Sequence, residues 1–291
     1  MGIENRGHAP VFNVHFLLSY PDTKGLIELP NAQSGFFEWV FFFVKTYGTM
    51  FLQGAGTTLL IALTGTIVGF VIGLGVGYVR AMPCERENGV ARYYLLKVVR
   101  TLLGVYIEIF RSTPMIVQAM VIFYGMASVF HINLPHLLAG FVIVSINTGA
   151  YLSEIVRGGI QSVDPGQQEA ALAIGMTYGQ SMLNVVLPQA IRNILPALGN
   201  EFVINIKDTS VLNVISVTEL FFVSKSAAGT YFKYFEVFFI TSCVYFVMTF
   251  TVTRLLRWLE KKMDGPDNYA IHGSQSVPDV ELIGRGGERI D

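Results

Sequence analysis

Long apolar runs separated by short polar segments dominate the chain from about residue 54 to residue 258. A helix that crosses the hydrocarbon core of a bilayer needs about 20 mostly apolar residues. Five segments reach this length: 54–79, 98–130, 137–156, 195–223 and 234–258. The pattern therefore predicts an all-α polytopic membrane protein with five transmembrane helices.

Polar segments flank this apolar region on both sides. Residues 36–44 are rich in aromatic side chains but short, and Lys45 is expected to end them, which predicts an interfacial helix before the first span. We divide the chain into an extracytoplasmic or interfacial extension (1–50), a transmembrane domain (51–262) and a polar cytoplasmic tail (263–291). The tail is expected to be loosely ordered.

Basic residues are distributed unevenly between the two sides of the predicted spans. The segment after the first span and the end of the fifth span carry most of them: Arg80, Arg86, Arg92, Lys97 and Arg100, then Arg254, Arg257, Lys261 and Lys262. The opposite side offers only Lys225 and Lys233. Because lysine and arginine are enriched in cytoplasmic loops, we expect the N-terminus outside the cell and the C-terminus in the cytoplasm.

Composition agrees with a membrane protein and excludes several other classes. Charged residues make up 14% of the chain, against about 25% in an average soluble domain, and the net charge of -1 argues against a nucleic-acid partner. His131 and His136 lack spaced partners for a metal, and Cys84 and Cys243 stand alone. No glycine-rich phosphate loop is present, so we expect no ATP or other cofactor on this chain.

Two features inside the spans carry structural information. The first span holds four glycines at a spacing of four, which place a bare stripe on one helix face for close packing of another helix: Gly65, Gly69, Gly73 and Gly77. The second span contains Arg111 and Pro114 within an apolar run, and Glu108 lies one turn earlier as a candidate partner of Arg111. A structural kink and a substrate pathway both remain open as interpretations of this break.

The segment between the third and fourth spans, about 159–190, predicts a compact helix–turn–helix in the cytoplasm. Asp164 or a neighbour can cap a short helix that Glu169, Ala170 and Ala171 open, and Gly175 marks its end. A second helix is expected to run to Leu187, where Pro188 stops it. Such a small exposed knob suits insertion into a groove on a partner protein.

This segment resembles the EAA loop of permease subunits of ATP-binding-cassette importers, in which Glu-Ala-Ala, a glycine four residues later and a terminal Leu-Pro recur. The resemblance implies a type I importer fold in which cytoplasmic coupling helices seat in a cleft of the ATPase. It assigns that coupling role to Glu169, Ala170, Ala171, Gly175, Leu187 and Pro188. The segments 106–118, 147–158, 188–201 and 207–210 are similar to the branch that transports polar amino acids such as histidine, glutamine, glutamate, arginine or cystine.

The same resemblance implies the partners and the location of the chain. It implies an ATP-binding-cassette ATPase dimer that binds ATP and Mg, a second permease copy or paralogue, and an extracytoplasmic amino-acid-binding protein. The location would be the inner membrane of a bacterial cell, surrounded by lipid.

An amino-acid substrate needs an acid for its ammonium group and donors for its carboxylate. Glu154 is the leading acid, and Asn147 lies two turns earlier on the same helix face. The candidate donors are Arg111 and a predicted helix break at Lys207, Asp208, Thr209 and Ser210. An ion pair of Glu154 with Arg157, and one between Lys207 and Asp208, are the structural alternatives.

The favoured function is therefore the permease subunit of an ATP-driven importer for a polar amino acid, with alternating access coupled to a partner ATPase. The alternative is a secondary amino-acid transporter driven by an ion gradient, a class that often shows two related halves. No internal repeat is visible in the sequence. An intramembrane enzyme would need a nucleophile–base pair or a metal set that the chain lacks, so we expect no enzymatic activity on this chain.

Overall fold

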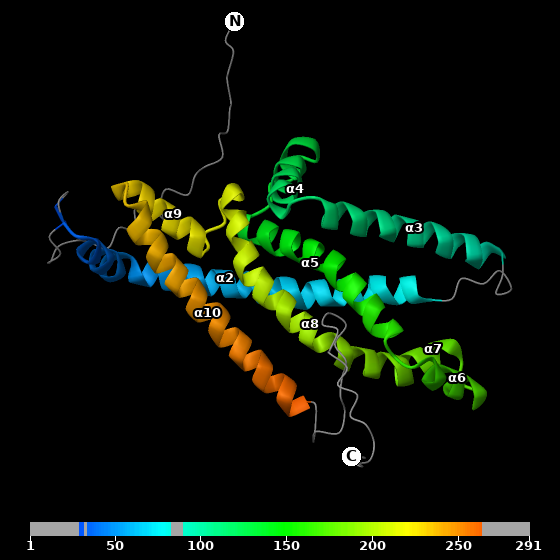
Figure 1. The fold of residues 1–291 in the computed structure, drawn as a ribbon. Helices are drawn as coiled ribbons and strands as arrows, with labels where there is room; N and C mark the ends of the chain where they lie inside the picture. The colour runs from blue at the N-terminus through cyan, green and yellow to red at the C-terminus, as the bar shows by residue number, and fades with distance from the viewer. Residues whose placement is uncertain (1–28, 32–33, 83–89, 264–291) are drawn as a thin grey trace, which may run out of the picture.

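The computed structural model describes residues 29–31, 34–82 and 90–263, and every regular element in these ranges is a helix (Figure 1). Most of the predicted N-terminal extension, nearly all of the C-terminal tail, and also Cys84 and Arg86, lie outside the described residues. The elements are α2 (Phe36–Ala81), α3 (Val90–Ser112), α4 (Met115–Val129), α5 (His136–Gln161), α6 (Pro165–Ala173), α7 (Tyr178–Ser181), a π-helical turn (Met182–Val186), α8 (Leu187–Asp208), a 3-10 helix (Thr209–Ile215), α9 (Leu220–Tyr231) and α10 (Tyr234–Met263).

Five membrane spans follow from these helices when each bent pair is counted as one span. Helices α2, α5 and α10 are each long and apolar enough to cross a membrane alone. Helices α3 and α4 meet at an angle of 115°, and the segment from Tyr178 to Ile215 meets α9 at 54°. The predicted all-α class and the predicted number of five spans are confirmed. The second and fourth spans, which contain polar interruptions in the sequence, are the two that are bent.

Helix α2 is one continuous helix of 46 residues, so the predicted end of a separate interfacial helix at Lys45 was wrong. At 1.5 Å per residue it is about 69 Å long, more than twice the thickness of a hydrocarbon core. The side chain of Lys45 is exposed, so its charge requires no break in the helix. The predicted domain boundary at residue 50 also falls inside α2.

The glycine stripe of α2 packs closely against another helix, as predicted, and that helix is α5. A Cβ atom added at Gly65, Gly69, Gly73 or Gly77 would meet Val144, Thr148, Leu152 or Val156, respectively, within 3.0 Å. Each step of four residues on α2 corresponds to a step of four on α5, so the two helices run parallel in a fixed register, side by side in Figure 1. Close approach of two backbones is the usual role of small residues in membrane helices.

Three apolar clusters follow one another along α2 and hold the bundle together. The first joins the aromatic start of α2 (Trp39, Phe42 and Phe43) to α9 and α10. The second surrounds Ile143 on α5 and includes residues of α4 and the 3-10 helix. The third, which we call the inner cluster, joins the last turns of α2 and α5 to the π-helical turn and the start of α8.

Candidate functional site

A helical hairpin formed by α6 and α7 projects from one end of the bundle (Figure 1). The Asp164 carboxylate accepts a hydrogen bond of 2.7 Å from the N–H of Gly166 and caps α6, as predicted. Gly175 follows the end of α6 with a φ of +92°, a left-handed conformation that favours glycine. Thr177 then caps α7 in a capping box with Gln180. Local sequence therefore defines both ends of the turn.

Two details of the predicted hairpin were wrong. Helix α6 begins at Pro165, so Glu169 lies beyond its first turn, which contains no acid. Leu187 and Pro188 directly follow the π-helical turn inside a run that is helical from Tyr178 to Asp208, so the helix continues where an end was predicted. The N–H of Leu187 donates to the carbonyl of Met182 five residues earlier, and this wider turn accommodates a residue that lacks a backbone N–H.

The base of the hairpin is fixed to the bundle. Val163, Met182 and Val186 are buried in the inner cluster against the ends of α2 and α5. The Tyr178 hydroxyl donates to the carbonyl of Ala81 at 3.3 Å, and the Asn193 amide donates to the Ser162 hydroxyl at 2.9 Å. Movement of the hairpin would therefore be transmitted directly to α2, α5 and α8.

The tip of the hairpin is exposed and apolar. Ile174 is 81% exposed and Leu172 is 43% exposed, while Glu169 and Ala170 are also on the surface. Ala171 is buried, and its carbonyl accepts a bond from the N–H of Met176 across the turn. An exposed large apolar side chain on a rigid support is typical of a protein–protein contact.

The second span is broken at Pro114, and one buried side chain repairs the break. The Gln118 amide group donates to the carbonyls of Phe110 and Thr113 at 2.9 and 2.8 Å, carbonyls that the interrupted helix leaves without helical partners. Its oxygen accepts a 2.8 Å bond from the Asn147 amide on α5. Asn147 thus connects the break to α5. No role was predicted for Gln118 from the sequence.

The proposed pair of Glu108 and Arg111 does not form. The Ser112 hydroxyl donates to Glu108, whereas the guanidinium of Arg111 lies 5.7 Å from the ring centre of Tyr151, one turn after Asn147 on α5. Both charged side chains are exposed in the single chain. Arg111 and Asn147 therefore face the same region between α3 and α5.

The predicted break at 207–210 is a change from α-helix to 3-10 helix, and the 54° bend of the fourth span comes after Ile215, before α9. Helix α8 ends at Asp208 and continues as a 3-10 helix from Thr209, whose side chain is buried and donates to the carbonyl of Ile206. Lys207 and Asp208 are exposed, and no ion pair joins them in the described part of the chain. Ser210 is half-buried, and its carbonyl accepts a bond from Asn213.

A buried polar link lies just before this break. The Asn205 amide donates to the Thr66 hydroxyl of α2 at 2.9 Å, and its oxygen accepts from the Thr148 hydroxyl of α5 at 3.1 Å. Thr148 is the residue after Asn147, so the two breaks are connected through α5. No local motif indicates this link, because its two threonines and one asparagine are far apart in the chain.

Glu154 lies apart from these groups, at the end of α5 near the hairpin. Arg80 of α2 contacts one of its oxygens, and Arg157 contacts the other at 2.8 Å. The ion pair with Arg157 that we considered is confirmed, and Arg80 adds a second one. With both oxygens contacted by cations, Glu154 is better suited to joining α2 and α5 than to binding an ammonium group.

Comparison with known proteins decides the family. Residues 89–265 match the family described as binding-protein-dependent transport system inner membrane component. The chain belongs to this family. The resemblance seen in the EAA loop is thereby confirmed.

Individual relatives agree with this assignment. The glutamine transport system permease protein of Escherichia coli strain K12 is 35% identical over 215 residues, which cover 74% of this chain and 93% of that protein. The arginine transport system permease protein of Bacillus subtilis strain 168 is 29% identical over 216 residues, with the same two coverages.

Solved structures show the same fold. A crystal structure of an amino acid ABC transporter with histidines contains a chain that is 35% identical, with a TM-score of 0.67, covering 79% of this chain and 100% of that one. An inward-facing methionine ABC transporter is 18% identical with a TM-score of 0.57, covering 72% and 96%, and supports the fold alone.

Replacing Glu154 by glutamine in this permease is expected to lower the free energy of unfolding by about 1 kcal/mol, because Arg80 and Arg157 lose their shared anion. Thermal unfolding of the purified chain in detergent measures this. The KM for uptake should stay unchanged. A raised KM with unchanged stability would contradict a structural role and favour contact with the substrate ammonium group.

Proposed function

We propose that this permease imports a polar amino acid and is driven by a separate ATP-binding-cassette ATPase that docks on the α6–α7 hairpin. The observation that carries the proposal is the exposed apolar tip at Leu172 and Ile174 on a base packed against three spans. A groove on the partner that receives this tip would move α2, α5 and α8 as one unit. Alternating access needs such a mechanical connection, since this chain has no phosphate loop of its own.

The substrate class is inferred from relatives and from the polar groups between the spans. Named relatives transport glutamine and arginine, and one similar structure was obtained with histidines. Arg111, Asn147 and the exposed Lys207 and Asp208 supply donors and an acid for a zwitterion at the two helix breaks. An extracytoplasmic binding protein would deliver the amino acid, and a second permease chain would complete the pathway.

The hairpin is placed in the cytoplasm of a bacterial cell in this proposal. The side that carries it also carries the basic residues at the ends of α2 and α10. Lysine and arginine favour the cytoplasmic side, so the start of α2 would lie outside. ATP and Mg would be bound by the ATPase dimer alone.

The test is co-purification of the permease with a candidate ATPase, comparing the native chain with Glu169→Arg and Ile174→Asp variants. Both side chains are exposed, so the fold of the permease should not change. Each variant is expected to lower the retained ATPase about tenfold or more, because a reversed charge or a buried carboxylate is costly in an interface. ATP-driven uptake of glutamine, arginine or histidine by reconstituted vesicles should fall in parallel.

The matched control is Gln167→Arg, which places a new charge on the same helix two residues away and on another face. It should retain the ATPase as the native chain does. Equal retention by all four chains, or none by the native chain, would reject the hairpin as the docking element.

A further inference from the structure

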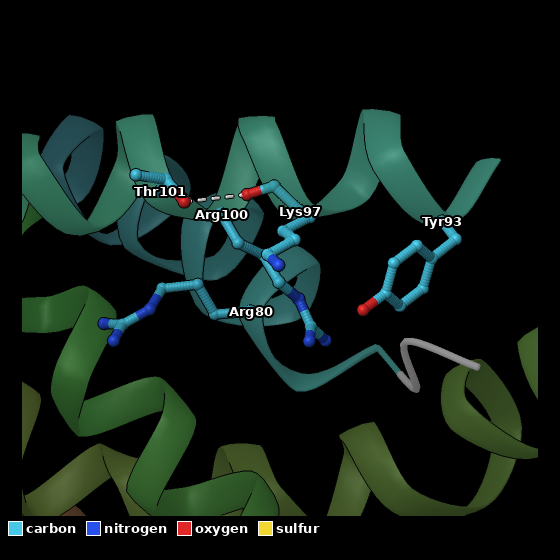
Figure 2. A pocket seen from close by; sticks show the side chains of 5 residues that line it. All are labelled: Arg80, Tyr93, Lys97, Arg100 and Thr101. Carbon is cyan, nitrogen blue, oxygen red and sulfur yellow. Dashed lines mark hydrogen bonds between the residues drawn. The ribbon is translucent and has the colours of Figure 1, made fainter. Parts of the chain in front are cut away.

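A cavity of about 480 Å³ opens between the end of α2 and the first turns of α3, away from both helix breaks. Its lining residues are Arg80, Tyr93, Lys97, Arg100 and Thr101 (Figure 2). It lies at the end of the bundle that carries the hairpin, because the last turn of α2 packs into the inner cluster. The transport cycle described above makes no use of these residues.

The charge of this cavity is positive and only partly compensated. Figure 2 shows Tyr93, Lys97 and Arg100 extending from α3 toward the end of α2, whereas the guanidinium of Arg80 turns toward α5, where Glu154 contacts it. Among the described residues no ion pair involves Lys97 or Arg100. The Nε–H of Arg100 donates to the carbonyl of Val79 at 3.3 Å and holds the guanidinium at the cavity.

The lining groups are predominantly hydrogen-bond donors. A guanidinium and an ammonium can both donate to the oxygens of one anion, and arginine in particular matches the geometry of a phosphate. Thr101 donates to the carbonyl of Lys97 within α3 and contributes its hydroxyl oxygen and methyl group to the wall. The chemistry therefore favours a phosphate-bearing ligand.

The face of α3 that lies opposite the cavity is apolar and exposed, which places this part of the helix at the level of the bilayer and argues for a lipid over a free phosphate ion. Leu95, Val98 and Leu102 recur at helical spacing on α3 and are each more than half exposed. They share the same turns of α3 with Lys97 and Arg100 but lie on the other side of the helix. A cavity at this level of a bilayer is within reach of phospholipid headgroups, and basic residues at this level attract anionic lipids.

We propose that this cavity binds the phosphodiester headgroup of an anionic phospholipid whose acyl chains extend into the surrounding bilayer. The single negative charge of the headgroup would lie between Lys97 and Arg100, offset part of their charge and fasten the start of α3 to the end of α2. This inference concerns lipid recognition and does not depend on the identity of the transported solute or on ATPase docking.

The test is native mass spectrometry of the purified full chain in detergent with phosphatidylglycerol or phosphatidylcholine at equal concentrations. The native chain should retain phosphatidylglycerol preferentially. The double variant Lys97→Gln/Arg100→Gln should bind it roughly tenfold to thirtyfold more weakly, since each basic residue near an anionic lipid contributes measurably. The conservative variant Lys97→Arg/Arg100→Lys should keep the preference.

The matched control is Arg257→Gln/Lys261→Gln, which removes the same charge from exposed positions at the same end of the bundle. It should bind phosphatidylglycerol like the native chain. Equal loss in both double variants would reject a specific site, as would an unchanged preference after loss of Lys97 and Arg100. Inorganic phosphate at millimolar concentration should not displace the lipid, and full displacement would reject the lipid in favour of a free phosphate ion.

One arm of the test needs no variant. Bound phosphatidylglycerol on the native chain should fall as salt is raised, because the attraction is between charges that salt screens. Retention that is independent of salt would contradict the proposal even if the double variant failed to fold.

Discussion

Replacing Gly73 by valine is expected to destabilise the permease by about 3 kcal/mol, the upper end of the usual cost of over-packing. A Cβ atom at this position would lie 2.8 Å from Leu152 Cβ, 2.9 Å from the carbonyl carbon of Leu152 and 3.1 Å from the backbone N of Ser153. Backbone atoms cannot move aside as a flexible side chain can, so α2 and α5 must separate. Thermal unfolding of the purified chain in detergent, followed by intrinsic fluorescence, measures the change.

Gly75→Val is the matched control for this experiment. It makes the same substitution two residues away on the same helix, where an added Cβ would meet nothing within 4 Å. Any effect of valine on helix propensity is shared by both variants, so their difference reports the contact with α5 alone. Equal stability of the two variants would show that the glycine stripe does not set the α2–α5 distance.

Replacing Asn205 by leucine is expected to lower the free energy of unfolding by about 2 kcal/mol. The substitution keeps similar bulk but removes the amide that joins α8 to Thr66 of α2 and Thr148 of α5. Thr148 then loses the partner that its hydroxyl has in the buried interior, while Thr66 still donates to the carbonyl of Ala62 at 2.7 Å. Unsatisfied buried groups cost about 1–3 kcal/mol, whereas single hydrogen bonds between membrane helices contribute less.

Asn193→Leu provides the comparison, because it changes the same residue type on the same helix at an exposed position that bonds to Ser162. We expect it to leave unfolding in detergent nearly unchanged. If Asn205→Leu proved as stable as the native chain, the link between the three spans would be structurally dispensable.

The outcome at individual residues shows why some predictions succeeded. Asp164, Gly175 and Pro114 act through their own backbone conformation or a bond to a close neighbour in sequence, so their roles were visible without a fold. The predictions that Lys45 and Pro188 each end a helix were wrong. An exposed lysine can project from a helix that continues, and a π-helical turn accommodates Pro188 within a continuing helix, so neither residue by itself specifies where a helix ends.

The sequence by itself determined the helical class, the five apolar segments, the glycine stripe, the break at Pro114 and the hairpin that led to the family. These features follow from periodicity and local geometry, which act over a few residues. Only the tertiary structure decided that Gln118 completes the break at Pro114, that Asn205 joins three spans, and that Arg80 shares Glu154 with Arg157. Each of these contacts joins residues from different helices, and their pairing depends on how the helices are rotated and spaced against one another, which no local pattern encodes.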